Sequence, residues 1–425
     1  MNNEFAGSTV FSTATDFSES EISTGALNDL LRQQLNPTKP FELSVTQNNE
    51  TEQNHQGLAL CVVNTVKEIL DNEKPNVVSL EQNLTTLFEN LHQIYQQANI
   101  DPALRKRQFI ARHGLVMSPD HCITTQKDTL RVCAFIRGAH QAIATLKTKS
   151  DECLHLVYPA CGPFAPLLLP LITYYKETGL YDENDLRITL IDMQQGAIDS
   201  LKVIIHEMGI AGYINDICCQ DACEYQPISP IHMVILEAMQ HGFSREGHLP
   251  IARHFAALME GNGIFLPQEI SLRAVLTAGQ QEFVEQWQDE NGHVCAADMQ
   301  QQTINARVQL GEILNLTSTS LLTLPERVLD ENISLIECGE VLLPELDERM
   351  SKPLLVICTQ IKVYGDEYID EYDSGITHPL PDMHVCVNFV PHDAKPGDLL
   401  VKSGDKLKFF YRLNGLPGFL ATIPA

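Results

Sequence analysis

Three acidic residues, Asp192, Asp221 and Glu237, each stand at or just after the end of a short apolar segment that is typical of a buried strand. In open α/β sheets, ligands bind beside the carboxyl ends of the strands. A carboxylate after the second strand can accept hydrogen bonds from both hydroxyls of a nucleoside ribose. A carboxylate after the third strand can accept a hydrogen bond from an adenine amino group. For each acid taken alone, the alternative is a helix N-cap, because acidic residues often begin the helix that follows a strand.

A fourth apolar segment, residues 154–158, precedes these three and leads into a loop that contains Ala160, Cys161 and Gly162. Glycine has no side chain, so the backbone at Gly162 can approach a ligand closely. The loop and the three acids recur in order over four consecutive segments. This order favours one shared ligand-binding edge over four unrelated caps.

The elements that must position these residues alternate between strand and helix. Helical patterns follow most of the apolar segments, and such alternation predicts right-handed βαβ crossovers and a mainly parallel sheet, a doubly wound α/β fold. The expected strands are 154–158, 186–191, 214–219, 233–236 and 264–266, and the expected helices are 167–175, 197–208 and 251–259.

The regions on either side of this sheet have different patterns. Residues 1–56 are polar and are expected to form a mobile leader, with one short helix at 26–35. Residues 57–150 are expected to be a helical region, residues 151–268 the α/β domain and residues 269–425 an antiparallel β domain. The finer expectations are helices near 59–70, 84–94 and 128–147, short strands at 273–276, 341–343, 354–363, 384–390 and 406–412, and helical interruptions at 280–287 and 299–314.

Composition excludes several functional classes. The 29 basic and 55 acidic residues give a net charge of −26, so the chain lacks the basic clusters that nucleic acid or anionic membranes require. The apolar stretch 156–175 contains four prolines, which argue against a membrane-spanning helix. No secretory signal begins the chain, so we expect a cytoplasmic protein with reduced cysteines. No Cys-x-x-Cys pair is present, and no metal site is expected.

The ordered loop and acids resemble the pattern of class I S-adenosylmethionine-dependent methyltransferases, and specifically of the protein arginine methyltransferase branch. That branch has Asp-x-x-Arg-x-x-x-aromatic on a helix ahead of the sheet, which Asp128, Arg131 and Phe135 match. It also has two glutamates nine residues apart after the fourth strand, which Glu237 and Glu246 match. The resemblance is clear over roughly residues 115–276 and extends loosely to the end of the chain.

The resemblance implies a Rossmann-like domain that binds S-adenosylmethionine. Asp192 would accept from the ribose hydroxyls, Asp221 would accept from the adenine, and Arg131 would pair with the methionine carboxylate as a bidentate fork. Ala160, Cys161 and Gly162 would form the loop against the cofactor. An exposed helix position is the alternative for Arg131.

The resemblance also implies an acceptor side. Glu237 and Glu246 would hold the N–H groups of a guanidinium acceptor, and one of them or His241 would remove its proton late in the transfer. The methyl acceptor is thus a nitrogen, or an oxygen, of a protein or a small molecule. The β domain would complete the wall around the acceptor and serve dimerisation, so a homodimer is a further expectation.

The chain departs from the family pattern at four places. The family's first loop reads close to Asp-x-Gly-x-Gly-x-Gly, whereas only Gly162 remains here and the early acid is absent. Asp192 lies about thirty residues past Gly162, beyond the roughly twenty usual for a nucleotide-binding unit. His241 stands where the family has an aromatic residue, and Thr377-His378-Pro379 where it has Thr-His-Trp. These departures bear on the acceptor more than on the cofactor.

Two other functions are weighed against the methyltransferase. A dinucleotide-dependent oxidoreductase on the same sheet would require Gly-x-Gly-x-x-Gly after the first strand, and only Gly162 is present. A catalytically degenerate binding or scaffold protein is favoured by the reduced loop but opposed by the retained acids and the glutamate pair. Calorimetry with S-adenosylmethionine and with NAD separates the two enzymes, and a turnover assay tests the scaffold.

Overall fold

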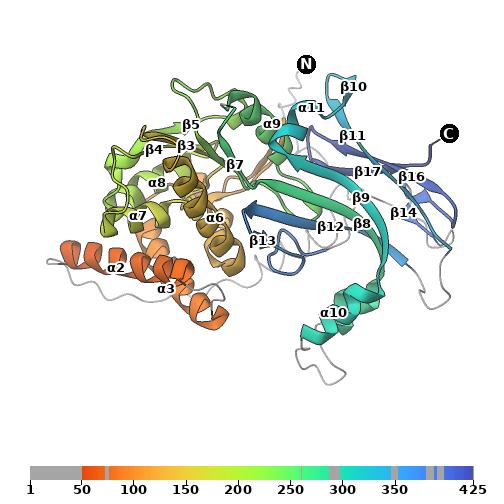
Figure 1. Cartoon of the computed structure of the whole chain (residues 1–425), viewed down its shortest axis with the longest axis horizontal. Coiled ribbons are helices and arrows are strands. Elements are labelled where there is room, and N and C mark those ends of the chain that lie inside the picture. Colours follow the sequence, from red (N-terminus) through yellow and green to blue (C-terminus); the bar gives the residue numbers. More distant parts are fainter. Residues whose placement is uncertain are drawn as a thin grey trace, which may run out of the picture. The chain divides into compact units, whose positions relative to one another are not determined.

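The structure is a computed structural model that describes residues 50–71, 76–259, 261–286, 297–345, 353–379, 387–389 and 397–424 (Figure 1). The expected leader lies outside the described residues up to residue 49, and so does its short helix at 26–35. Helix α2 begins at Glu50, before the expected leader ends at residue 56. The structure therefore does not test the predicted mobility of the leader.

Three long helices precede the sheet, as the sequence predicts. They are α2 (Glu50–Asp71), α3 (Val77–Gln97) and α6 (Thr129–Lys147). Their apolar residues recur every three to four positions and are buried, so each helix is stabilised by packing on one side. The side chain of Asn76 caps α3, and that of Asp128 caps α6. Helix α2 packs against α3, α6, α7 and α8 (Figure 1).

A series of short elements that the sequence did not predict joins α3 to α6. It comprises α4 (Pro102–Arg105), the hairpin of β1 (Phe109–Ala111) and β2 (Gly114–Val116), α5 (Pro119–Cys122) and the 3-10 helix η1 (Ile123–Lys127). Elements of three to five residues leave too short a periodic pattern to be recognised in a sequence.

The predicted parallel sheet is confirmed. Its five strands lie in the order β5-β4-β3-β6-β7, and every neighbouring pair is parallel. The order reverses direction between β3 and β6, which makes this position the switch point where open α/β sheets bind ligands. The strands are β3 (Leu154–Pro159), β4 (Leu186–Asp192), β5 (Ile214–Cys219), β6 (Met233–Ile235) and β7 (Ile264–Leu266).

Helices connect these strands at the expected places. They are α7 (Leu169–Thr178), α8 (Gln195–Met208) and α9 (His248–Leu258), with the 3-10 turns η2 (Ala211–Tyr213), η3 (Ala222–Glu224) and η4 (His241–Phe243). Gly179 and Gly209 end α7 and α8 in the left-handed conformation, which glycine adopts without steric cost. The central strand β3 is buried along its whole length.

The rest of the chain contains two antiparallel four-stranded sheets. The first has the order β13-β12-β8-β9, and the second β10-β11-β16-β17. The strands are β8 (Glu269–Ala278), β9 (Val308–Thr317), β10 (Glu326–Asp330), β11 (Ile333–Leu342), β12 (Pro353–Tyr364), β13 (Glu367–Ile369), β16 (Lys406–Arg412) and β17 (Gly418–Thr422). Smaller elements are α11 (Ser318–Thr323) and the parallel pair β14 (Val387–Asn388) and β15 (Leu399–Leu400). The protein is thus a mixed α/β protein with one parallel sheet and antiparallel sheets.

One expected element after β8 is wrong. The helix expected at 299–314 is α10 (Ala297–Ala306) followed by strand β9, so its second half is strand. The pairing of β8 with β9 is interrupted by two bulges, and Gly311 has a φ of 134°. Bulges break the alternation of apolar and polar residues by which a strand is recognised. The interruption expected at 280–287 is a π-helical turn, η5 (Gln281–Glu285), and Trp287 lies outside the described residues.

One continuous hydrophobic core extends from α2 and α3 through the parallel sheet to the antiparallel sheets. Helix α6 contributes to the link, because it packs on β6 and β7 of the parallel sheet and on β12 and β13 of an antiparallel sheet. The predicted domain boundaries within this region stay predictions. Within the described residues, none of the helices combines the length and apolar character needed to span a membrane.

The packing of α6 on β12 is tested by replacing Gly138 with alanine. A Cβ atom at Gly138 would lie 2.6 Å from Val363 Cγ1, whereas one at Gly57 in α2 would meet no described atom within 4 Å. Both substitutions gain the helix propensity of alanine, so their difference isolates the clash. We expect Gly138→Ala to be less stable than Gly57→Ala by about 1–3 kcal/mol in urea unfolding. Equal stability of the two variants would contradict this packing.

Candidate active site at the carboxyl ends of the parallel strands

The structure brings the loop and the three acids to one edge of the parallel sheet. The loop follows β3, Asp192 ends β4, Asp221 follows β5, and Glu237 follows β6. These four strands are neighbours in the order β5-β4-β3-β6. The carboxyl ends of parallel neighbours meet at the same edge, so the sequential order of these residues becomes a spatial one.

Asp192 holds the loop after β3 and the start of α8 together. Its Oδ2 accepts the Gly162 N–H at 2.9 Å, and its Oδ1 accepts the Gln194 N–H at 2.8 Å. Burial raises the pKa of Asp192 to about 6, although these backbone hydrogen bonds act in the opposite direction. A carboxylate oxygen has more than one lone pair, so both oxygens retain capacity for the hydroxyls of a ligand.

The loop after β3 turns sharply through two left-handed residues. Ala160 has a φ of 51° and Gly162 a φ of 66°. Glycine adopts this conformation freely, but for alanine it is sterically costly and must be held by its surroundings. The intervening Cys161 is buried, and its N–H donates to the Ile191 carbonyl at 3.2 Å.

Asp221 is the N-cap of the turn η3. Its Oδ1 accepts the Cys223 N–H at 2.9 Å, which is the capping role that the sequence left open as an alternative. The Cys223 thiol also hydrogen-bonds to this carboxylate, whose remaining lone pairs can accept a further donor. Capping and ligand binding are therefore compatible at this residue.

Arg131 is buried and lies between two carboxylates, so the alternative of an exposed helix position is wrong. The residue is 9% exposed. Its Nη1 donates to Glu237 Oε2 at 2.9 Å, and its Nη2 lies 3.1 Å from Asp128 Oδ2. Burial acts to lower the pKa of Arg131, but Glu237 and Asp128 raise it above its usual value. Its Nε is buried and has no hydrogen-bond partner in the described part of the chain.

The segment between the two glutamates folds back on itself. Gln240 and Ser244 exchange backbone hydrogen bonds of 3.2 and 3.3 Å, and Ser244 Oγ donates to the His241 carbonyl at 2.8 Å. This tight turn returns the chain toward Glu237, so that Glu246 lies within electrostatic range of it. The segment that separates Glu237 from Glu246 therefore forms a loop whose two ends lie near each other.

The two glutamates are held in different states. Burial raises the pKa of Glu237, while Arg131 acts to lower it and Met239 N–H donates to its Oε1 at 3.4 Å. The pKa of Glu246 rises to about 8, first through burial and then through repulsion by Glu237. Glu237 is thus paired with Arg131, whereas burial and the neighbouring Glu237 favour the protonated form of Glu246 at neutral pH.

His241 is a neutral imidazole at physiological pH. Burial, followed by electrostatic effects of Arg245 and His378, lowers its pKa to about 4. His378 belongs to the segment that follows β13, so the antiparallel region reaches the loop of the glutamates. The structure therefore places His241 with the site.

Two residues that the sequence did not assign to the site lie in it. Cys122, at the end of α5, is partly buried, and its thiol pKa is raised by desolvation and then by Asp192, Glu246 and Glu237. Ser374 Oγ donates to Asp128 Oδ2 at 2.6 Å, and so joins the segment after β13 to α6. A lone cysteine and a lone serine carry no spacing signal, so the sequence offered no means of finding them.

The β1–β2 hairpin covers the loop of the glutamates. Leu115 N–H donates to the Arg245 carbonyl at 2.7 Å, and a Cβ atom at Gly114 would lie 2.6 Å from Gly247 N. Gly114 has a φ of 148° and its residue type is fixed by this close approach. The hairpin thus holds the backbone on which Glu246 is carried.

The acidic run 366–373 is tied down by hydrogen bonds and ion pairs. Asp370 N–H donates to Asp373 Oδ2 at 2.8 Å, and Gln360 Nε2 donates to Asp370 Oδ1 at 2.6 Å. Glu371 pairs with Arg273 and Arg307. These contacts hold the segment in place, while Asp366 and Asp370 are exposed to solvent.

A separate cavity of about 530 Å³ opens at the amino ends of the same strands. Its lining includes His155 near the start of β3, Arg187 near the start of β4 and His232 just before β6. It lies at the opposite edge of the sheet from the acids and shares no residue with the candidate site. Among the described residues, no three His, Cys, Asp or Glu side chains are arranged to hold a metal ion.

No protein-family model matches the sequence, and no curated protein matches it. Among solved structures, the chain is similar to that of the Trypanosoma brucei PRMT1 enzyme–prozyme heterotetrameric complex with AdoHcy. The identity is 13% and the TM-score is 0.38, over 70% of this chain and 90% of the other. A likeness at this level does not define the function, which must be argued from the site.

The state of Glu246 is tested by the pH dependence of stability. Its folded pKa of about 8 exceeds its usual value, so the folded protein binds this proton more tightly than the unfolded chain. The free energy of unfolding therefore falls as the pH rises from about 5 to 8. We expect Glu246→Gln to match wild type near pH 5 and to exceed it near pH 8.5 by on the order of a few kcal/mol.

Urea unfolding at the two pH values measures this difference, with Glu326→Gln at a partly exposed ion pair as the matched control. The raised pKa of Asp192 contributes equally to the pH dependence of unfolding in wild type and in the variant. It therefore cancels in the difference between their free energies of unfolding. Parallel stability curves of wild type and Glu246→Gln would show that Glu246 is ionised in the folded protein.

Proposed function

We propose that the chain is an S-adenosylmethionine-dependent methyltransferase of the arginine-methyltransferase type, acting on a nitrogen or oxygen of a protein or small molecule. The observation that supports this most is the placement of the buried pair Glu237 and Glu246 at the same sheet edge as Asp192 and the Gly162 loop. That edge is the switch point of the sheet. A cofactor and an acceptor bound there would lie against each other.

The residues present fit the cofactor. Asp192 retains lone pairs for the ribose hydroxyls, and Asp221 retains lone pairs for the adenine amino group. The buried Nε of Arg131 lacks a partner among the described residues, so it would donate to the methionine carboxylate. The left-handed turn at Ala160 and Gly162 presents backbone rather than side chains toward this position.

The acceptor side would be formed by the glutamate loop. When bound, S-adenosylmethionine supplies an electrophilic methyl group on a sulfonium. The chain must hold the acceptor lone pair on the methyl axis and exclude water. Glu237, paired with Arg131, would accept a hydrogen bond from an N–H or O–H of the acceptor. A cationic acceptor would lower the pKa of Glu246, which would release its proton to solvent before the transfer. One of the two carboxylates, or the neutral His241, would then take the acceptor proton late.

The second candidate is a catalytically degenerate binding or scaffold protein. The observation that favours it is the loop itself, where alanine occupies the left-handed position at Ala160. Cofactor binding without turnover on any acceptor would support this candidate. A homodimer and a cytoplasmic location complete the proposal, and size-exclusion chromatography with light scattering tests the first of these.

The cofactor side is tested by Asp192→Ala. Losing one partner of a buried charged hydrogen bond costs about 2–5 kcal/mol, so affinity for S-adenosylmethionine should fall by at least roughly thirtyfold. Isothermal titration calorimetry measures it, beside thermal unfolding to show that the variant is folded. Asp216→Ala, an exposed carboxylate of β5, is the matched control and should bind as wild type does. Undiminished binding by folded Asp192→Ala would remove Asp192 from the site.

The acceptor side is tested by Glu237→Gln and Glu246→Gln. Each should abolish methyl transfer on an accepted substrate. Glu246→Gln should leave S-adenosylmethionine affinity within a few-fold, because this carboxyl group acts on the acceptor. Glu237→Gln also removes the charged partner of Arg131, so it should weaken S-adenosylmethionine binding further. Transfer would be assayed against arginine peptides, free guanidines, amines and phenols, with Glu326→Gln as control. If both variants kept full activity on a substrate that wild type accepts, the pair would have no part in the mechanism.

A further inference from the structure

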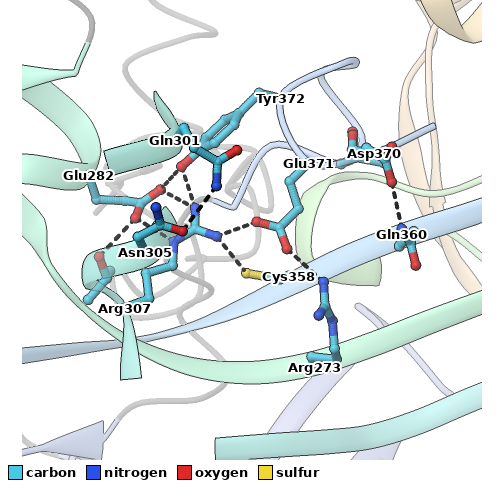
Figure 2. A network of polar contacts seen from close by, with 12 residues as sticks. Arg273, Glu282, Gln301, Asn305, Arg307, Cys358, Gln360, Asp370, Glu371 and Tyr372 are labelled. Carbon is cyan, nitrogen blue, oxygen red and sulfur yellow. Dashed lines mark hydrogen bonds and ion pairs between the residues drawn. The ribbon is translucent and has the colours of Figure 1, made fainter. Parts of the chain in front are cut away.

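A second buried charged cluster lies away from the candidate site, where the segment between β8 and β9 returns to the sheet. Arg307 directly precedes β9, and its side chain is 1% exposed. Its Nε and Nη2 bind Glu282 Oε2 and Oε1 at 2.9 and 2.7 Å, a bidentate pair with a residue of η5 that is itself fully buried. Figure 2 shows the guanidinium between Glu282 and Tyr372 on one side and Glu371 on the other.

The cluster is balanced in charge. Arg307 pairs with Glu282 and Glu371, and Glu371 also accepts from Arg273 Nη2 at 3.0 Å. Burial acts to raise the pKa of Glu282, but the hydrogen bonds from Arg307 and Tyr372 lower it overall. Buried ion pairs contribute little net stability compared with apolar residues of similar size. The cluster is therefore better explained by the geometry that it fixes than by the stability that it adds.

The geometry that it fixes is that of residues 370–378, the segment after β13, which we call the β13 loop. Glu371 and Tyr372 both belong to this loop and both bind Arg307. Tyr372 has a φ of 72°, a left-handed conformation that is strained for a bulky residue and must be held by its surroundings. Its hydroxyl is held by Arg307 and Glu282, and the guanidinium lies 5.4 Å from its ring centroid. The cluster therefore holds the strained residue, Tyr372, by both its hydroxyl and its ring.

The β13 loop connects this cluster to the candidate active site by two routes. Ser374 Oγ donates to Asp128 Oδ2 at 2.6 Å, and Asp128 lies 3.1 Å from Arg131, which binds Glu237. The His378 ring packs edge-on against Tyr372 with centroids 5.4 Å apart, and it lies within electrostatic range of His241. The contacts form a continuous physical chain of the kind that can carry coupling between two sites.

We propose that Arg307 is a positioning residue for the candidate active site: by holding Tyr372 and Glu371 it fixes the β13 loop, and through Ser374 it sets the Asp128–Arg131 pair. Arg307 touches neither cofactor nor acceptor. The assignment deepens the proposed function and rests on it for the meaning of the Arg131 position. The link between the cluster and α6 is a property of the chain itself, and it can be measured without any ligand.

The first measurement is hydrogen–deuterium exchange of the full chain without ligand. Tyr372→Phe keeps the ring against His378 and loses only the hydroxyl, so it should fold. Arg307→Lys keeps the charge and loses the fork. In each variant we expect amide exchange to quicken at least several-fold in the β13 loop and also at residues 129–132, where α6 begins. Strand β4 and the exposed-pair control Arg327→Lys should remain as in wild type.

Faster exchange in the β13 loop alone, with residues 129–132 unchanged, would overturn the link to Arg131. Unchanged exchange in both regions would overturn the role of Arg307 itself. Should Arg307→Lys fail to fold, amide exchange of Tyr372→Phe in the β13 loop and at residues 129–132 tests the proposal in the same way.

The second measurement is calorimetry with S-adenosylmethionine. Tyr372→Phe and Ser374→Ala should each weaken binding on the order of three- to tenfold, and the double variant should be no weaker than the worse single one, because both act through Arg131. Additive losses, or wild-type affinity in both single variants, would overturn the positioning role. If wild type itself binds no S-adenosylmethionine, the proposed function fails, while the exchange result still decides whether Arg307 positions α6.

Discussion

The ion pair between Arg131 and Glu237 is the contact on which the rest of the candidate site depends. Arg131 is carried by α6, and Glu237 follows β6, so the pair joins the helical region to the switch point of the parallel sheet. Asp128 at the start of α6 binds the same guanidinium and also Ser374 from the antiparallel region. Removing one partner of a buried pair leaves an uncompensated charge, so the three regions are constrained to meet in this one arrangement.

A chain with a net charge of −26 has few cations available for its buried acids. Glu237 and Asp128 share Arg131, and Glu282 and Glu371 share Arg307. Glu246 and Asp192 make no ion pair with an arginine among the described residues, and their pKa values rise to about 8 and 6, in each case first through burial. The acids are thus of two kinds, those paired with an arginine and those without such a pair whose pKa values lie near neutral pH. Titratable groups with such shifted pKa values are common at functional sites.

The sequence allowed the parallel sheet and its acids to be predicted because both rest on local patterns. Apolar runs gave the strands, and the position of Asp192 or Glu237 after a strand gave its place at the sheet edge. The helix expected at 299–314 was wrong because bulges between β8 and β9 interrupt the alternation of β9. Cys122, Ser374 and Arg307 could not be found in this way, since their partners are distant in sequence and no spacing rule relates them.

The loop after β3 shows how a shortened glycine pattern can keep its shape. A phosphate- or nucleoside-binding turn needs residues in the left-handed conformation and a fixed distance to the next strand. Glycine adopts the left-handed conformation with the least steric cost. Here Ala160 takes one such position at a steric cost, and the Gly162 N–H is fastened to Asp192. Asp192 also holds the start of α8 through Gln194. The carboxylate that would bind the ribose therefore also sets the backbone of the loop, so loop geometry and ligand recognition depend on the same side chain.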